Sequence, residues 1–361
     1  MKRTLINIAI LSTILGTGMS QAGGWDRSGQ DTSIILKEGN LLEITSVSVA
    51  PKITGKYKLD SSATGDVAPD YSFTNIAFRT DINDDFSIAI IQDEPFGAGV
   101  DWVTGTGAYT TVKAKIDTSA TTLLVGYDLD NITVYGGLKN QTFGASATVP
   151  INSRTLYSIT STPDTSLGYV VGAAIERPEI ALRVALTYHT KVSHDVSVVE
   201  KINGSAYPGS VLSADTPSSF NLDFQTGVAE NTLLFGSVRS VQWTQTVLSP
   251  AVFSSAGVAN KPLKKFTSDT ITYNVGLGRK FSDQWSGAVT YGTEAAEGTQ
   301  GGPLGPTDGY SKMGVGVTYS GEQADITLGV QQINNGNTDT AAATMSDNTT
   351  LVTAVKIGYK F

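Results

Sequence analysis

Apolar and polar residues alternate with a period of two along most of the chain after residue 40. Between residues 182 and 187, one face carries Leu182, Val184 and Leu186, while small or polar residues occupy the positions between them. The same alternation recurs at 270–281, 312–320 and 351–361. A period of two is that of a β-strand with one apolar face, and no sustained helical period follows residue 40. The pattern therefore predicts an all-β fold.

The connections between these segments fall into two kinds that alternate along the chain. Six are short polar turns, near residues 83–85, 128–131, 177–179, 229–231, 282–283 and 320–322. Seven are longer segments rich in Gly, Ser, Thr, Pro and Asp, near 58–69, 95–111, 142–165, 193–217, 244–266, 294–308 and 335–347. This rhythm predicts fourteen antiparallel strands with short turns at one end and long loops at the other, which is typical of a bacterial transmembrane barrel.

A secreted β-sandwich or β-helix would also show alternation. Three features favour the barrel: strands of ten or more residues, a second face of Gly, Thr, Ser and Lys that suits a wet lumen, and a final aromatic strand that ends in Phe361. In hydrocarbon every backbone N–H and C=O must be paired internally, so a membrane sheet has to close on itself. We therefore expect a 14-stranded antiparallel transmembrane β-barrel.

The first 22 residues have the composition of an export signal. Lys2 and Arg3 precede an apolar stretch of about ten residues, and Ser20-Gln21-Ala22 fits a cleavage site with small residues at its critical positions. An ordinary N-terminal helix is the alternative, and the stretch is too short to span a bilayer. We expect three parts: a signal peptide at 1–22, a plug at 23–40 and the barrel at 41–361.

Composition excludes several classes of protein. The chain has no Cys, so it has no disulfide, no thiolate zinc site and no cysteine nucleophile. Its formal net charge of −8 offers no basic surface for nucleic acid. His189 and His194 are the only histidines, and no nucleophile motif surrounds either of them. The stretch Asp81–Asp85 begins like a calcium loop but lacks the required Gly and Glu. We therefore expect no enzyme, no metal site and no cofactor.

Several short motifs resemble, in the same order, those of the outer-membrane long-chain fatty-acid transporters of the FadL type. They are Ser28-Gly29-Gln30, Glu38-Gly39-Asn40, Pro51–Gly55, Asn83–Ile88 with Glu94–Gly97, Gly168–Gly172 with Leu182–Val192, Val241–Thr244 and Ile357–Phe361. The resemblance implies a monomeric 14-strand barrel with an internal plug and a bent third strand beside a gap in the wall. It also implies that ligand is taken up outside and released sideways. Where the family tends to carry Asn-Pro-Ala, this chain has Leu41-Leu42-Glu43.

The segment 23–40 is the candidate plug. It contains an apolar cluster that a bare periplasmic tail, the alternative, would not need. The residues assigned to the plug are Ser28, Gly29, Ile34, Ile35, Leu36, Gly39 and Asn40.

The segment 94–102 is the candidate lateral gate. Pro95 cannot donate to a ladder and Gly97 permits a bend, so the third strand should break here. Phe96 and Trp102 add apolar surface for a ligand. The alternative is an ordinary loop whose aromatic rings touch lipid headgroups.

Two further groups are candidate ligand contacts. Val252 and Phe253 lie in an unusually apolar loop, which either binds ligand or packs into the barrel mouth. Arg183, His189 and Lys191 fall on the lumen face of one strand. They could pair with a carboxylate headgroup, or form a solvated row balanced by acidic plug residues.

These features together predict passive uptake of hydrophobic small molecules, with long-chain fatty acids as the leading class and lateral release into the membrane. A general diffusion porin for small polar solutes is the alternative, and a structural or adhesive barrel would need longer outer loops. The expected partners are the ligand, outer-membrane lipids and the barrel-insertion machinery, and the expected location is the bacterial outer membrane.

Overall fold

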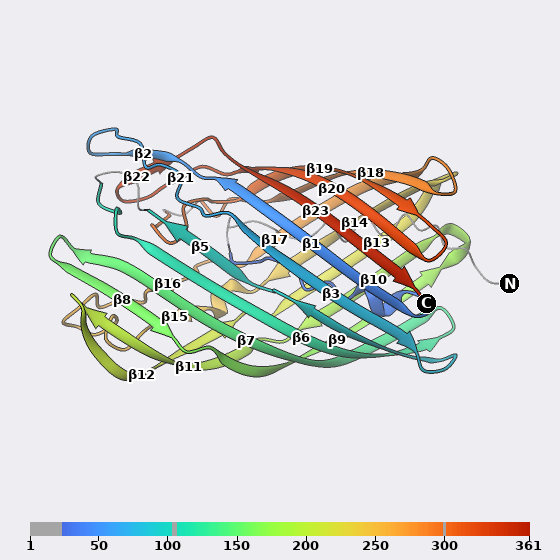
Figure 1. Ribbon diagram of the computed structural model, residues 1–361, viewed down its shortest axis with the longest axis horizontal. Helices are drawn as coiled ribbons and strands as arrows, with labels where there is room; N and C mark the ends of the chain where they lie inside the picture. Colours follow the sequence, from blue (N-terminus) through green and yellow to red (C-terminus); the bar gives the residue numbers. More distant parts are fainter. Residues whose placement is uncertain (1–23, 103–106, 299–300) are drawn as a thin grey trace.

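The computed structural model describes residues 24–102, 107–298 and 301–361, so the predicted signal peptide lies outside the described residues. The chain forms a closed antiparallel barrel whose strands run obliquely to its long axis (Figure 1). The barrel closes because its first strand, Leu41–Lys52, pairs with the last strand, Asn348–Lys360, on one side and with the strand Tyr71–Asp81 on the other. Among the described residues, no helix is long and apolar enough to cross a membrane.

The wall consists of long strands, and short elements occupy the loops and the N-terminal segment. The wall strands are β1 (Leu41–Lys52), β3 (Tyr71–Asp81), β4 (Phe86–Asp93), β5 (Gly97–Asp101), β6 (Lys113–Leu129), β7 (Ile132–Asn152), β8 (Thr155–Ser161), β9 (Asp164–Arg177), β10 (Leu182–His189), β11 (Val192–Ile202), β12 (Ser205–Thr216), β13 (Ser219–Ala229), β14 (Thr232–Val241), β17 (Thr270–Lys280), β18 (Trp285–Glu294), β19 (Tyr310–Ser320), β20 (Ala324–Asn335) and β23 (Asn348–Lys360). The short elements are η2 (Ser33–Leu36), β2 (Gly55–Tyr57), η3 (Pro178–Ile180), η4 (Trp243–Gln245), β15 (Val247–Leu248), β16 (Lys264–Lys265), β21 (Thr338–Asp339) and β22 (Ala343–Met345).

The predicted number of fourteen strands is confirmed. Within the described residues the barrel sheet contains 18 hydrogen-bonded segments. Four crossings are each interrupted once, so that β4 continues as β5, β8 as β9, β10 as β11 and β12 as β13. All six predicted short turns lie between strands at one end of the barrel. At the turn after β3, Asn83 Oδ1 accepts hydrogen bonds from the backbone N–H groups of Asp85 and Phe86, and these bonds tighten the turn.

Two of the seven predicted long loops are wrong. Residues 142–165 and 193–217 are extended wall, and each forms a hairpin with a two-residue turn, β7 to β8 and β11 to β12. Their Ser and Thr content suggested loops, but alternation continues through them: Val196 and Val198 are buried and the residues between are exposed. These strands rise beyond the apolar part of the wall, so polar outer residues suit them.

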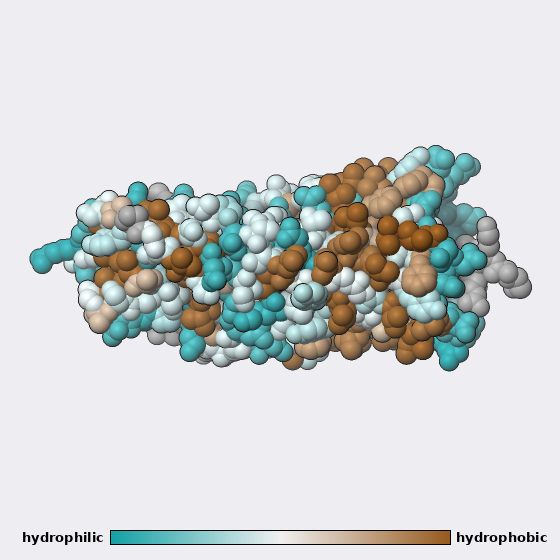
Figure 2. Space-filling view, turned by 90° about the horizontal axis from the view of Figure 1, so that it is seen from below, coloured by the Kyte–Doolittle hydropathy of each residue, from teal (hydrophilic) through white to brown (hydrophobic). Residues whose placement is uncertain are grey.

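The outer wall carries an apolar band at the end that bears the short turns. Figure 2 shows brown side chains concentrated in that half, with a hydrophilic rim beyond them. Tyr273, Val289 and Met313 are among the outward side chains, at 53%, 57% and 67% exposure. Their inward neighbours Thr272 and Thr290 are buried. The predicted arrangement of an apolar outer face and a polar inner face is therefore confirmed, and it matches what a bilayer requires of a barrel wall.

The segment 24–40 lies inside the barrel. Ile34 and Ile35 are 3% and 1% exposed and pack against inward side chains of β4, β6, β7, β9 and β10. The segment ends at the short-turn end, where the Arg79 guanidinium donates to the Gly39 carbonyl oxygen at 2.6 Å. Burial of an apolar side chain of this size contributes about 1.5–3 kcal/mol, so the apolar cluster stabilises the segment inside the lumen.

Phe361 follows the closing strand at the same end. It is 60% exposed, and its ring stacks on those of Phe78 and Tyr359 at 6.0 Å and 6.1 Å. We expect Phe361→Ser to lower the amount of assembled barrel severalfold without changing transport per molecule, because stacked aromatic pairs add about 0.5–1.5 kcal/mol each to the seam. Heat-modifiable mobility in electrophoresis measures assembly. Normal assembly with lost uptake would contradict the prediction.

Candidate functional site

An apolar chamber lies in the half of the barrel that carries the long loops. Two cavities of about 270 Å³ and about 50 Å³ share Trp25, Ala98, Val100, Lys264 and Leu304 among their lining residues. The smaller cavity is lined by wall residues of β5, β6, β7 and β8, and the larger one by the loops 264–267 and 301–308. A concave, mostly apolar site with few polar groups is what a small-molecule site usually looks like.

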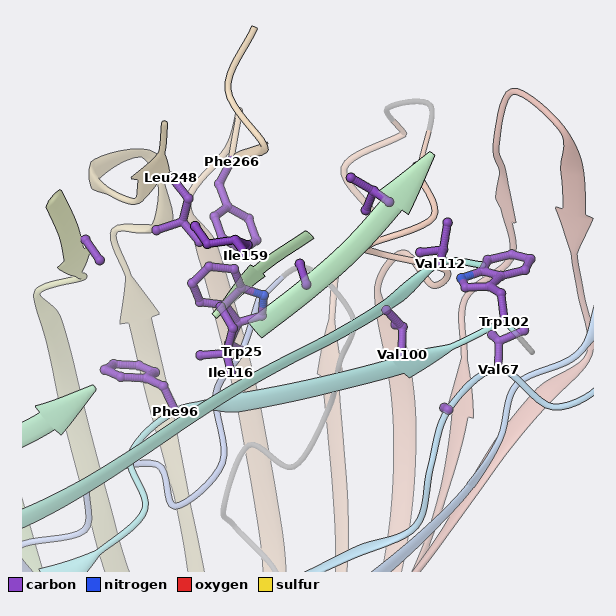
Figure 3. Close-up of a cluster of buried hydrophobic side chains, with 14 of the residues drawn as sticks. Trp25, Val67, Phe96, Val100, Trp102, Val112, Ile116, Ile159, Leu248 and Phe266 are labelled. Atoms are coloured by element: carbon purple, nitrogen blue, oxygen red, sulfur yellow. The ribbon is translucent and has the colours of Figure 1, made fainter. Parts of the chain in front are cut away.

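Trp25 forms the floor of this chamber. Figure 3 shows its ring among Phe266, Leu248, Ile159 and Ile116, which come from two wall strands and from the loop between β14 and β17. The Trp25 and Phe266 rings meet edge to face, with centroids 5.0 Å apart. The N-terminal segment, the wall and the outer loops therefore meet in a single apolar cluster.

Lys264 is the basic residue that lines both cavities. Its ammonium lies over the Phe266 ring, 4.5 Å from the centroid. Burial lowers the pKa of Lys264 below its usual value, while the nearby Glu297 carboxylate acts in the opposite direction. The lysine thus offers a partly dehydrated positive charge beside apolar surface.

The barrel wall has a gap beside the chamber. β3 pairs with β4 only from Ile76↔Gln92 towards the short turn, and β5 pairs with β6. Among the described residues, Tyr71–Asn75 pair with β1 on one side and with no wall strand on the other. The ladder is therefore broken between the outer part of β3 and β5, at the bend 94–96.

The N-terminal segment pairs with the inner side of this bend. Arg27 N donates to the Pro95 carbonyl oxygen at 3.0 Å, and Gly97 N donates to the Trp25 carbonyl oxygen at 2.7 Å. Asp26 and Phe96 face each other as an isolated antiparallel bridge. Backbone groups freed by the break are therefore satisfied by the segment 25–28, which buried backbone groups require.

Arg239 fastens the same segment to the opposite wall. Its guanidinium donates two hydrogen bonds to the Asp26 carboxylate, at 2.6 Å and 2.9 Å, and further ones to Gln30 Oε1 and Asn221 Oδ1. A bidentate, charge-assisted pair is among the stronger polar contacts available.

The predicted gate residues lie at the bend, as the sequence suggested. Phe96 is 1% exposed and packs edge to face on Trp243, with centroids 5.5 Å apart. Trp102 lies farther out, fully buried, where its indole N–H donates to the Pro303 carbonyl oxygen at 2.8 Å. Both rings belong to the apolar cluster around the chamber, but neither lines the two cavities.

The apolar loop is folded into the barrel mouth. The backbone N–H groups of Val252 and Phe253 donate to the Glu200 carboxylate, and the Phe253 ring packs against Tyr157 with centroids 4.8 Å apart. This geometry matches packing at the mouth. The same loop supplies Leu248 and Leu263 to the smaller cavity.

The three predicted basic residues, Arg183, His189 and Lys191, do not form one row on the lumen face. Arg183 faces the lumen, where it pairs with Glu176 and donates to the Leu36 carbonyl oxygen at 2.8 Å. His189 also faces inward and is 2% exposed. The expectation that Lys191 shares their face is wrong: it lies in the break between β10 and β11, is exposed, and pairs with Asp215 at 2.8 Å.

Sequence reasoning missed the residues that the structure places most centrally, namely Trp25, Lys264, Arg27 and Arg239. A Trp three residues after a cleavage site and a lysine pair within an apolar loop were the available signals. Arg239 follows the alternation of its strand as an inward residue. The alternation of apolar and polar residues gives no information on contacts between segments that lie about 200 residues apart in the sequence, such as Asp26 and Arg239.

Comparison with known proteins was made by sequence and by structure. No protein-family profile and no curated protein matches the sequence. A crystal structure of a Pseudomonas aeruginosa FadL homologue matches with a TM-score of 0.77 at 15% identity, covering 97% of this chain and 98% of the homologue. The barrel has the FadL-type fold.

Hydrocarbon transporters share that FadL-type fold with this chain. The Pseudomonas putida toluene transporter TodX matches with a TM-score of 0.66 at 9% identity, covering 90% of this chain and 91% of TodX. The Ralstonia pickettii toluene transporter TbuX matches with a TM-score of 0.62 at 11% identity, covering 90% of each chain. TodX and TbuX are transporters and not enzymes.

Proposed function

We propose that this protein is a passive outer-membrane channel for hydrophobic small molecules, with long-chain fatty acids as the leading class. The observation that carries the proposal is the apolar chamber beside a gap in the wall. Relatives in fold include a FadL homologue and monoaromatic hydrocarbon channels, which support a hydrophobic cargo. Each methylene buried in the chamber would contribute about 0.8 kcal/mol to binding.

The gap supports lateral release. Ligand in the chamber lies beside Ala98 and Val100 of β5, and no wall strand pairs with the edge of β5 that borders the break among the described residues. The segment 24–40 acts in this proposal as the plug. Its Ser28 and Gly29 line a further cavity of about 110 Å³ in the lumen, and Asn40 lies at its end. The proposed lateral gate is Pro95–Gly97, where the plug pairs with the wall.

Lys264 favours a carboxylate over a neutral hydrocarbon, because it is a positive charge at the rim of an apolar chamber. We expect Lys264→Met to weaken oleate binding about tenfold and to leave toluene binding unchanged, since a hydrogen bond to a charged group contributes about 1.5–3 kcal/mol. Tryptophan fluorescence titration of the detergent-solubilised protein measures both ligands. Equal losses for oleate and toluene would show that the lysine acts through packing.

The same lysine gives a pH dependence of defined sign. Because burial lowers the pKa of Lys264, the contribution of its charge to oleate affinity should be complete at neutral pH and be lost on the alkaline side, at a pH below that of an ordinary lysine. Lys264→Arg should move that loss to higher pH, since arginine stays charged. An oleate affinity that is constant up to pH 10.5, the ordinary value for lysine, would contradict a role for this ammonium.

A general diffusion porin remains the alternative function. It requires an open polar lumen, whereas the segment 24–40 fills the lumen with buried side chains such as Ile35 and Gln30. Steady large conductance of the intact protein in planar bilayers, without binding of oleate or toluene, would favour the porin.

The proposed setting is the bacterial outer membrane, reached through the export signal at 1–22. Lipid contacts would come from the apolar band, and the barrel-insertion machinery would act on the end of β23. We propose that the protein works as a monomer, because β1 and β23 pair with each other and close the sheet within one chain.

A further inference from the structure

Arg27 is the one basic residue of the segment 25–28, and its side chain extends into the gap in the wall. Its backbone lies in the lumen, where it pairs with Pro95. Its guanidinium lies where a Cβ on Gly97 would point, only 2.3 Å from that position. Ala98 and Val100 face the lumen, so the alternation of β5 directs the Gly97 position outward. The arginine therefore runs from inside the barrel to the outer side of β5.

Partners from both edges of the gap hold the guanidinium. Arg27 Nη1 lies 2.9 Å from Glu94 Oε2 and 3.9 Å from Asp117 Oδ1, on the side of β5 and β6. On the side of β3, the guanidinium lies 4.6 Å from the centre of the Tyr71 ring. The side chain is 6% exposed. One residue thus joins two strands that have no ladder between them.

The outer rim of the gap suits a charged residue. Outward positions next to it are polar: Ser72 and Thr74 on β3 and Gln92 on β4 are exposed. A guanidinium in hydrocarbon would be costly, but above the apolar band it meets polar groups and the carboxylates of the rim. The sequence accommodates it by placing a glycine at position 97, where a Cβ would lie 2.3 Å from Arg27 Cζ.

We propose that Arg27 is the bolt of the lateral gap: its side chain closes the break between β3 and β5 and has to leave for a ligand to pass. This inference rests on the proposed function only for what passes, since the closure itself follows from the contacts. Arg27 is also hydrogen-bonded to Pro95 through its backbone, so a displacement of the plug that breaks this bond also withdraws the bolt. The identity of this side chain therefore sets how often the gap is open.

Opening can be measured without transport. The chain has no native Cys, so Asn75→Cys, beside the gap, can be labelled with bimane as a single site. In proteoliposomes, a nitroxide on the phospholipid headgroup quenches the dye only through an opening in the wall. We expect Arg27→Ala to raise the open fraction about tenfold, because one charge-assisted hydrogen bond is lost. Gly97→Ala should act in the same direction, since the added Cβ displaces the guanidinium.

Two variants serve as controls. Lys115→Ala removes a cation that pairs with Asp117 at 2.8 Å on the same rim, and should leave quenching unchanged. Arg27→Lys keeps the charge but loses the planar contact with Tyr71, and should give an intermediate open fraction. Unchanged quenching in both Arg27→Ala and Gly97→Ala would overturn the bolt. If quenching rises while uptake of both oleate and toluene stays absent, the bolt stands and the proposed transport function fails.

Discussion

A disulfide between residues 26 and 96 should stop uptake of hydrophobic substrate. Asp26 and Phe96 form an antiparallel bridge flanked by the Arg27–Pro95 and Gly97–Trp25 hydrogen bonds. This is the non-hydrogen-bonded kind of pair, with Cα atoms about 4.5 Å apart, within the range that a disulfide spans. Asp26→Cys with Phe96→Cys would therefore pin the plug to the bend. Because plug and gate could then not separate, we expect oleate uptake into cells to fall at least about tenfold on oxidation.

Reduction provides the internal control for this experiment. Dithiothreitol should restore uptake to that of the reduced double variant, and each single cysteine variant should be insensitive to oxidant. Single variants also report the cost of losing the Asp26–Arg239 pair or the Phe96 ring. An oxidised double variant that transports as fast as the reduced one would exclude movement of the plug relative to the bend.

Deletion of residues 25–36 should convert the protein into an open pore. This stretch supplies Trp25, Ile34 and Ile35 to the interior, and the wall itself closes without it through β1, β3 and β23. A barrel lumen freed of its internal segment is a water-filled channel. We expect single-channel conductance in planar bilayers to rise at least about tenfold, while heat-modifiable mobility shows that the barrel still assembles.

Arg239→Ala is the milder counterpart of the deletion. It keeps every plug residue but removes the two hydrogen bonds to Asp26. Frequent brief openings are expected in place of a permanent pore, because the apolar cluster still holds the segment. A large conductance in the intact protein that neither change increases would contradict a plug at 24–40.

The fold was accessible from the sequence because strand periodicity and turn chemistry are local properties. The alternation Leu182–Thr187 determines which side chains face lipid, and Asn83 determines its own turn. Because a β-sheet in a membrane has to close on itself, an even number of long strands can then be arranged in few ways. The two hairpins mistaken for loops show the limit. Above the apolar band the outer face of a strand is rich in Ser and Thr while its inner face stays apolar, so composition alone does not separate strand from loop.

The site was only partly accessible, because its contacts join distant segments. Pro95 and Gly97 gave the bend, since both residues act on the local backbone. Nothing local indicates that Arg27 reaches Tyr71 or that Lys264 borders the chamber, because these contacts depend on how the plug and loops enter the lumen. Lys191 was misplaced for a related reason: an interruption after β10 breaks the alternation that the prediction had extended through it.

The hairpins β7–β8 and β11–β12 affect how readily proteases can cleave the protein. They carry the wall outward as paired strands, with turns as short as Asn203-Gly204. Proteases need an extended, unpaired segment of chain. Loop tips provide such a segment, whereas residues hydrogen-bonded in a sheet are not accessible to the protease. Over this part of its rim the protein therefore offers a protease few unpaired residues. Among the described residues, the segments 249–263 and 301–309 are more open to cleavage.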